Sequence, residues 1–118
     1  MEILKEIFVP KKVFDTDIIN VGMKCLLCLD YSYGTNTYNY VYHCTVDNIA
    51  WDGTIIELKE KEGYIDYISD EVRFRKHYIK PEEVGFKNKY YLEFDKEKWD
   101  KFIKEADYVD GWNTWYDD

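Results

Sequence analysis

The amino-acid sequence predicts an α+β fold, mainly antiparallel β-strand with one amphipathic helix near the C-terminus. Two observations lead to this class. Apolar and polar residues alternate with a period of two over several short segments, the pattern of strands with one buried face. One segment after residue 95 instead repeats its apolar residues at intervals of three and four, as a helix does. The strands are expected to form a small barrel or a strongly bent sheet.

The size and composition of the chain favour a single domain. The chain has 118 residues, of which 46% are hydrophobic and 19% aromatic. A chain near this size buries roughly two-thirds of its unfolded surface, so one core forms without covalent staples. A single domain over residues 1–118 is therefore expected, with the sheet over about 18–94, the helix over about 96–109 and a tail over 110–118.

The first half of the chain predicts a series of hairpins. The N-terminal segment favours a strand near residues 3–9, and residues 23–29 alternate in the manner of a strand with one face in the core. Residues 38–46 alternate too, with one face made of Tyr38, Tyr40, Tyr42, Cys44 and Val46. A polar loop at 32–37 joins these two segments. Asp52-Gly53 is the strongest turn signal, because this pair tolerates the positive φ angles of a tight hairpin.

The second half predicts further strands and the helix. Six glycines divide the chain, and the segments 64–68, 72–79 and 89–94 are expected to be strands. One short helical turn is expected at 80–84, with proline at its first position. Asp95 is the expected helix N-cap, and Gly111 is expected to end the helix. The apolar stripe of this helix consists of Trp99, Phe102, Ile103 and Ala106.

The succession of short strands, the Asp52-Gly53 hairpin and the helical turn after the 73–79 strand resemble a small SH3-like or Tudor-like barrel with a C-terminal helix. The resemblance covers roughly residues 18–86 and is one of rhythm, without signature residues. Folds of this kind host unrelated functions, so the resemblance implies an architecture and no activity.

The net charge of −8 is distributed unevenly along the chain. Residues 47–71 carry eight acidic residues and two lysines, a net charge of −6, whereas residues 72–92 carry a net charge of +4. An acidic surface favours a basic partner and repels nucleic acid. The candidate partner-binding residues are Glu57, Glu60, Glu62, Asp66, Asp70 and Glu71. Two simpler interpretations remain: acidic loops that keep the protein dissolved, and pairing with the basic strand that follows.

The tail after residue 110 combines large aromatic residues with acids. Its candidate binding residues are Trp112, Trp115, Tyr116 and Asp117. Trp and Tyr are enriched at binding hot spots, so the tail is a candidate anchor for a partner. The alternative is that both tryptophans fold back and cap the core.

A basic strand supplies the second functional hypothesis. Its candidate residues are Arg73, Arg75, Lys76 and Lys80, with Phe74 and Tyr78 interleaved. Cations beside aromatic rings suit a module that binds a peptide or a single nucleic-acid strand. The overall charge of −8 opposes contact with phosphates, so direct nucleic-acid binding is disfavoured.

No metal site, cofactor or catalytic centre is expected. Cys25, Cys28, His43 and Cys44 have the ligand count of a zinc site. However, the first two cysteines lie in a strand, where residues three apart face opposite sides, so buried thiols are expected. Ser69, Asp70 and His77 lack the nucleophile elbow and oxyanion loop of a hydrolase. Residues 107–113 fail the calcium-loop spacing.

The general character of the chain gives the functional expectation. No targeting or membrane segment is visible, and the odd number of cysteines suits a reducing cytoplasm. The chain has fourteen lysines, two arginines and eleven isoleucines. Lysine and isoleucine have AT-rich codons, so the gene is expected to come from an AT-rich bacterium or one of its phages. Small, acidic and without motifs, the chain is similar in character to phage inhibitors of the anti-CRISPR and anti-restriction type. That similarity implies a non-catalytic inhibitor that binds the basic surface of a nucleic-acid-handling enzyme such as a defence nuclease.

Overall fold

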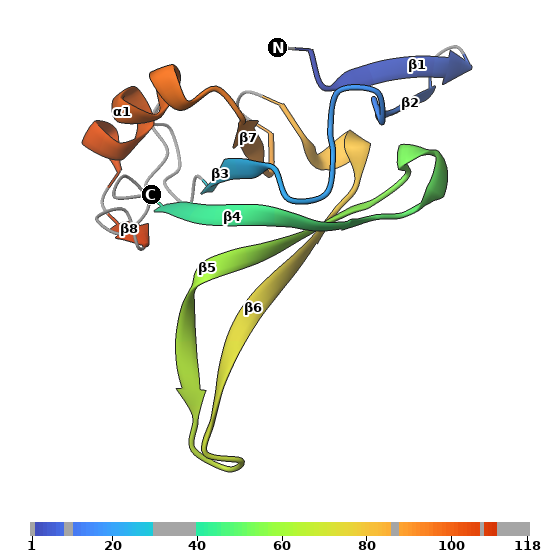
Figure 1. The fold of residues 1–118 in the computed structure, drawn as a ribbon. Coiled ribbons are helices and arrows are strands. Elements are labelled where there is room, and N and C mark those ends of the chain that lie inside the picture. Colours follow the sequence, from blue (N-terminus) through green and yellow to red (C-terminus); the bar gives the residue numbers. More distant parts are fainter. Residues whose placement is uncertain (1, 9–10, 30–39, 86–87, 107, 111–118) are drawn as a thin grey trace.

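The computed structural model describes residues 2–8, 11–29, 40–85, 88–106 and 108–110. Its elements in chain order are β1 (Leu4–Phe8), β2 (Lys11–Phe14), β3 (Lys24–Leu29), β4 (Tyr40–Ile49), η1 (Trp51–Gly53), β5 (Ile56–Asp66), β6 (Glu71–Ile79), η2 (Pro81–Glu83), β7 (Tyr91–Glu93), α1 (Lys96–Glu105) and β8 (Tyr108–Asp110). Antiparallel strands dominate, and α1 follows them near the C-terminus (Figure 1), so the predicted α+β class is confirmed.

The main sheet is open and bent. Its strands lie in the order β6-β5-β4-β3-β7, each antiparallel to its neighbour, while β1 and β2 form a separate hairpin. Among the described residues the end strands β6 and β7 do not pair, so the sheet adopts the bent form and not the barrel. Figure 1 shows that β5 and β6 run away from the body instead of curving back towards β7, which leaves the sheet open.

Strand β3 is the centre of the core. The sequence predicts one buried face for this strand, but the structure buries both faces. Cys25, Leu27 and Leu29 belong to a cluster that includes Phe14 from the N-terminal hairpin. Leu26 and Cys28, on the other face, pack in a second cluster with Trp99 of α1. The apolar run of β3 is therefore that of a central strand covered on both sides.

Helix α1 begins where the sequence predicts and ends earlier. The side chain of Asp95 caps it by accepting a hydrogen bond from the backbone N–H of Glu97 at 3.0 Å. The helix ends at Glu105 with Ala106 as C-cap, so the expected end near residue 109 and the expected Gly111 cap are wrong. The chain leaves the helix early because residues 108–110 form β8, which pairs in parallel with β4.

The Asp52-Gly53 turn joins β4 to β5, as predicted. Asp52 and Gly53 have φ angles of 65° and 71°, and the backbone N–H of Ala50 donates to the carbonyl of Ile55 at 2.8 Å. A Cβ atom on Gly53 would collide with the carbonyl oxygen of Phe14. Glycine therefore lets this turn pack directly on β2.

Helices long and apolar enough to cross a bilayer do not occur in the part of the chain that the structure describes.

Candidate functional site

The outer part of the β5–β6 hairpin projects from the body as an arm, defined here as residues 61–75 (Figure 1). Strand β5 pairs with β4 only as far as the Cys44–Glu60 pair, and β8 occupies the same edge of β4 at residues 40–42. Among the described residues, those of the arm consequently pair only with one another. The Cα radius of gyration is 14.8 Å, against about 13.5 Å for a compact chain of this length.

Gly63 lies inside the arm and does not divide two strands. The segment 64–68, expected as a separate strand, continues β5 as far as Asp66. A Cβ atom on Gly63 would lie 2.8 Å from Cγ1 of Val72 and 3.0 Å from Cε1 of Phe74. Glycine thus makes room for two side chains of β6 to lie across β5.

A turn held by Asp66 forms the tip of the arm. The carboxylate of Asp66 accepts a hydrogen bond from the N–H of Ile68 at 3.0 Å, and its carbonyl accepts one from Asp70 at 2.7 Å. Tyr67 and Ile68, expected at the end of a strand, lie in this turn instead and are 91% and 98% exposed. The Asx turn that Asp66 makes is the sequence signal that could have located the tip.

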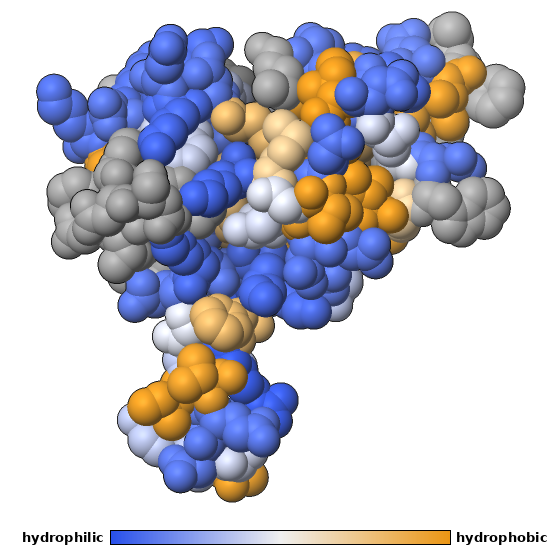
Figure 2. Space-filling model, viewed as in Figure 1, coloured by the Kyte–Doolittle hydropathy of each residue, from blue (hydrophilic) through white to orange (hydrophobic). Residues whose placement is uncertain are grey.

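Apolar side chains also lie along the arm. Ile65 is paired with Val72, and alternation along β6 places Phe74 on the same face. These three residues are 53%, 63% and 42% exposed. Figure 2 shows apolar residues gathered on the projecting arm. Single exposed apolar residues are common, whereas several on one face of a hairpin are a candidate interaction surface.

The six acidic residues singled out from the sequence all lie on the β5–β6 hairpin or its turn: Glu57, Glu60, Glu62, Asp66, Asp70 and Glu71. Basic neighbours on β6 offset part of their charge. Glu57 lies 3.6 Å from Lys76, while Asp66 and Glu71 lie 2.8 and 3.8 Å from Arg73. The arm holds four acidic and three basic residues, a net charge of −1, so its surface is not uniformly negative.

Three of the four residues of the proposed basic strand contact other side chains of the protein, and the fourth lies beyond the strand. Lys76 lies 3.3 Å from Asp47, and the hydrogen bond with Asp47, followed by the charge of Glu57, raises the pKa of Lys76. Arg75 lies over the ring of Tyr64, with 5.4 Å between its guanidinium carbon and the ring centroid. Arg73 is paired as described above, and Lys80 follows the end of β6 with an exposed side chain.

A carboxylate–imidazole pair marks the base of the arm. Glu60 is only 5% exposed, and its Oε2 lies 2.6 Å from Nε2 of His77 on the neighbouring strand. The pair links β5 to β6 where the arm leaves the sheet. Ser69 and Asp70 lie in the tip turn at the opposite end of the hairpin, so the structure does not bring them together with His77.

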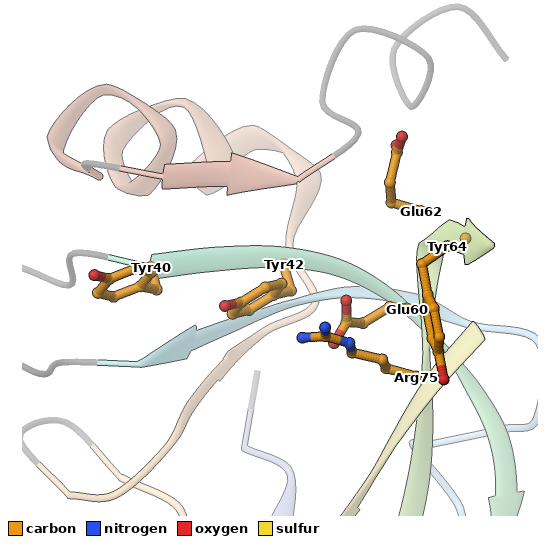
Figure 3. A pocket seen from close by; sticks show the side chains of 7 residues that line it. Tyr40, Tyr42, Glu60, Glu62, Tyr64 and Arg75 are labelled. Carbon is orange, nitrogen blue, oxygen red and sulfur yellow. The ribbon is translucent and has the colours of Figure 1, made fainter. Parts of the chain in front are cut away.

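A cavity of about 280 Å³ opens beside this pair. The side chains that line it come from β4, β5 and β6 (Figure 3): Tyr40, Tyr42, Glu60, Glu62, Tyr64 and Arg75. Tyr40 and Tyr42 lie on the same side of β4, and Arg75 extends towards them from β6. The sequence predicts one face for Tyr40 and Tyr42, but their meeting with the arm depends on pairing between distant segments.

The three cysteines are buried, and no disulfide joins them. Cys25 is the register partner of Cys44 across β3 and β4, whereas Cys28 belongs to the cluster on the other face, as strand geometry predicts. Burial raises the pKa of the Cys25 and Cys28 thiols far above their ordinary value. No cluster of three or more metal-ligating side chains occurs among the described residues.

The aromatic tail stays a prediction. Trp112, Trp115, Tyr116 and Asp117 lie outside the described residues, as does most of the segment 107–113, whose spacing fails the calcium-loop pattern.

Comparison of the chain with family models, curated proteins and solved structures gave no match.

Proposed function

We propose that this protein is a non-catalytic binding protein whose arm docks onto a partner protein with a basic surface. The observation that carries the proposal is the apolar tip of the arm. Tyr67 and Ile68 are 91% and 98% exposed, and Asp66 holds the turn that presents them. Burying an isoleucine side chain in a partner contributes about 1.5–3 kcal/mol, and tyrosine is among the residues most often found at binding hot spots.

The construction of the arm adds a second argument. A two-stranded ribbon has marginal stability by itself in water, and here its apolar face is largely exposed. A partner that covers Ile65, Val72 and Phe74 would remove this surface from water and order both strands. The arm is therefore suited to insertion into a groove or to packing against a sheet.

Charge supports the choice of partner. The chain carries a net charge of −8, which steers a basic partner towards it over long distances. Enzymes that handle nucleic acids present basic surfaces, and a protein seated on such a surface would inhibit the enzyme by blocking access. The proposal includes this inhibitory role and a cytoplasmic location, which the three buried cysteines without a disulfide support.

A second candidate uses the outer edge of β6, the last strand of the sheet. A peptide that adds a strand at this edge would gain backbone hydrogen bonds. Replacing Arg73, Arg75 and Lys76 together by alanine should weaken the binding of an acidic peptide at this edge, because it removes the charges that attract the peptide. Serine substitutions at the arm tip would leave this binding intact.

The proposal is tested by affinity capture from bacterial lysate with three immobilised proteins: wild type, the double variant Tyr67→Ser/Ile68→Ser, and the control Val21→Ser. Val21 is 61% exposed and lies outside the arm, so its substitution removes a comparable apolar group from another surface. We expect a protein that wild type and the control retain and the double variant loses. Equal retention by all three proteins would refute binding through the arm tip.

A further inference from the structure

The cavity at the base of the arm has the chemistry of a cation-binding site. Tyrosine rings from two elements line it, Tyr40 and Tyr42 from β4 and Tyr64 from β5. The face of an aromatic ring attracts a guanidinium or ammonium group, most strongly where water is partly excluded. Pockets that hold drug-sized ligands measure roughly 300–1,000 Å³. At about 280 Å³ this cavity suits a smaller group, such as one side chain.

A buried carboxyl group accompanies the rings. Glu60 lines the cavity and is only 5% exposed, and its interaction with His77 at 2.6 Å holds the side chain in place. Glu62 belongs to the lining as well, although Figure 3 shows it pointing away from the other side chains. The Glu60 carboxylate favours a cation over a phosphate group at this position.

One cation of the chain already shows how the cavity binds. The guanidinium carbon of Arg75 lies 5.4 Å from the centroid of the Tyr64 ring, and Figure 3 shows the side chain extending towards Tyr42 and Glu60. Among the described residues, no carboxylate lies within ion-pair distance of Arg75. The contact with the Tyr64 ring is therefore the interaction of Arg75 that a competing cation would have to replace.

We propose that this cavity accepts an arginine side chain from the basic partner and that Arg75 occupies part of the site until the partner binds. Arginine fits better than lysine, because its planar guanidinium stacks on tyrosine rings as Arg75 does on Tyr64. The inference rests on the proposed function for the source of the arginine. The chemistry of the cavity is independent of that source and can be measured without the partner.

The test is a titration of the full chain, labelled with ¹⁵N, with N-acetyl-arginine amide, followed by two-dimensional NMR. N-acetyl-citrulline amide is the matched probe, since it has nearly the same shape and no charge. We expect arginine, and not citrulline, to shift the backbone resonances of Tyr42, Glu60, Gly63 and Arg75. Equal shifts from both probes, or shifts confined to other residues, would overturn the proposal.

Two variants sharpen the result. Tyr42→Leu removes a ring and should weaken arginine binding roughly two- to thirtyfold, the range expected for a cation–π contact. Arg75→Ala removes the resident cation and should strengthen binding roughly two- to fivefold. The second variant gives an increase, which misfolding cannot produce, so unchanged or weaker binding by Arg75→Ala contradicts the proposal even if Tyr42→Leu fails to fold.

The outcomes also separate this inference from the proposed function. If arginine does not bind but Tyr67 and Ile68 are still required for partner capture, the arm docks without the cavity. If arginine binds and partner capture does not depend on the tip, the cavity stands and the arm proposal fails.

Discussion

Shortening the arm should change the shape of the protein and leave its stability nearly intact. Tyr64 and Arg73 face each other in the register of β5 and β6. The eight residues between them, 65–72, can therefore be replaced by Asn-Gly, which closes a two-residue hairpin turn. The shortened chain keeps the base of the arm, including the cavity and the Glu60–His77 pair.

The expected change in stability follows from what these eight residues contact. None of them belongs to either buried cluster of the described residues. Their removal breaks the ion pairs of Arg73 with Asp66 and Glu71, which are surface pairs worth about 0.2–1 kcal/mol each. The shorter loop offsets part of this loss through a smaller closure entropy. The free energy of unfolding should therefore fall by no more than about 1 kcal/mol.

Two measurements check this result. Urea unfolding followed by circular dichroism gives the free energy of unfolding of both proteins. Small-angle X-ray scattering gives their radii of gyration. The radius of the full chain is 14.8 Å, and that of the shortened chain should be smaller and approach about 13 Å, the value for a compact chain of 112 residues. A loss of more than about 2 kcal/mol, or an unchanged radius, would show that the arm packs against the body.

Three further substitutions test the fold. Trp99→Ala removes a side chain that is 1% exposed and donates its indole N–H to the carbonyl of Glu93 at 3.1 Å, so urea unfolding should show a loss of about 3–5 kcal/mol. A loss below about 1 kcal/mol would contradict the packing of α1 on β3. Gly53→Ala should lower the melting temperature more than Gly22→Ala. Both residues have positive φ, but only at Gly53 does an added Cβ meet backbone atoms; equal losses would argue against the contact with β2. Glu83 accepts a hydrogen bond from the backbone N–H of Lys80 at 3.0 Å, and this bond, with the Lys89 ammonium at 3.1 Å, lowers the pKa of its carboxyl below 4.5. A carboxyl group whose pKa is lower in the folded than in the unfolded chain stabilises the fold at pH values above its unfolded pKa, and this stabilisation is lost as the pH falls through its folded pKa. Glu83→Gln should therefore cost about 0.5–1 kcal/mol at neutral pH and nothing once wild-type Glu83 is protonated. A pH-independent cost, measured by urea unfolding, would refute the assignment.

Local features of the fold are accessible from the sequence because a few neighbouring residues determine them. The capping side chain of Asp95 and the apolar spacing that leads to Trp99 define the start of α1. The Asp52-Gly53 pair defines the β4–β5 turn for the same reason, since its positive φ angles are a property of those two residues.

Features that depend on distant pairing are not accessible in this way. Gly63 resembles a strand boundary in the sequence, yet it is retained inside β5 because Val72 and Phe74 need the space above it. The arm begins where β5 stops pairing with β4, and β8, from the far end of the chain, occupies the next part of the same edge of β4. No local pattern predicts that arrangement or the cavity beside it.

The acidic residues illustrate the same limit for function. Along the sequence, Glu57 and Asp66 lie in an acidic segment, and Arg73 and Lys76 lie in the basic segment that follows. This order suggests an acidic surface and a separate basic one. The hairpin brings these residues within 3.6 and 2.8 Å of each other as ion pairs. The apolar tip at Tyr67 and Ile68 then becomes the more distinctive feature of the surface.

The most direct test of the central claim is hydrogen–deuterium exchange of the chain alone and bound to the protein that it captures. If the arm docks onto the partner, the amides of residues 61–75 should become protected in the complex, whereas those of α1 should exchange at unchanged rates. Protection confined to α1 or to the N-terminal hairpin, with unchanged exchange in the arm, would contradict the claim.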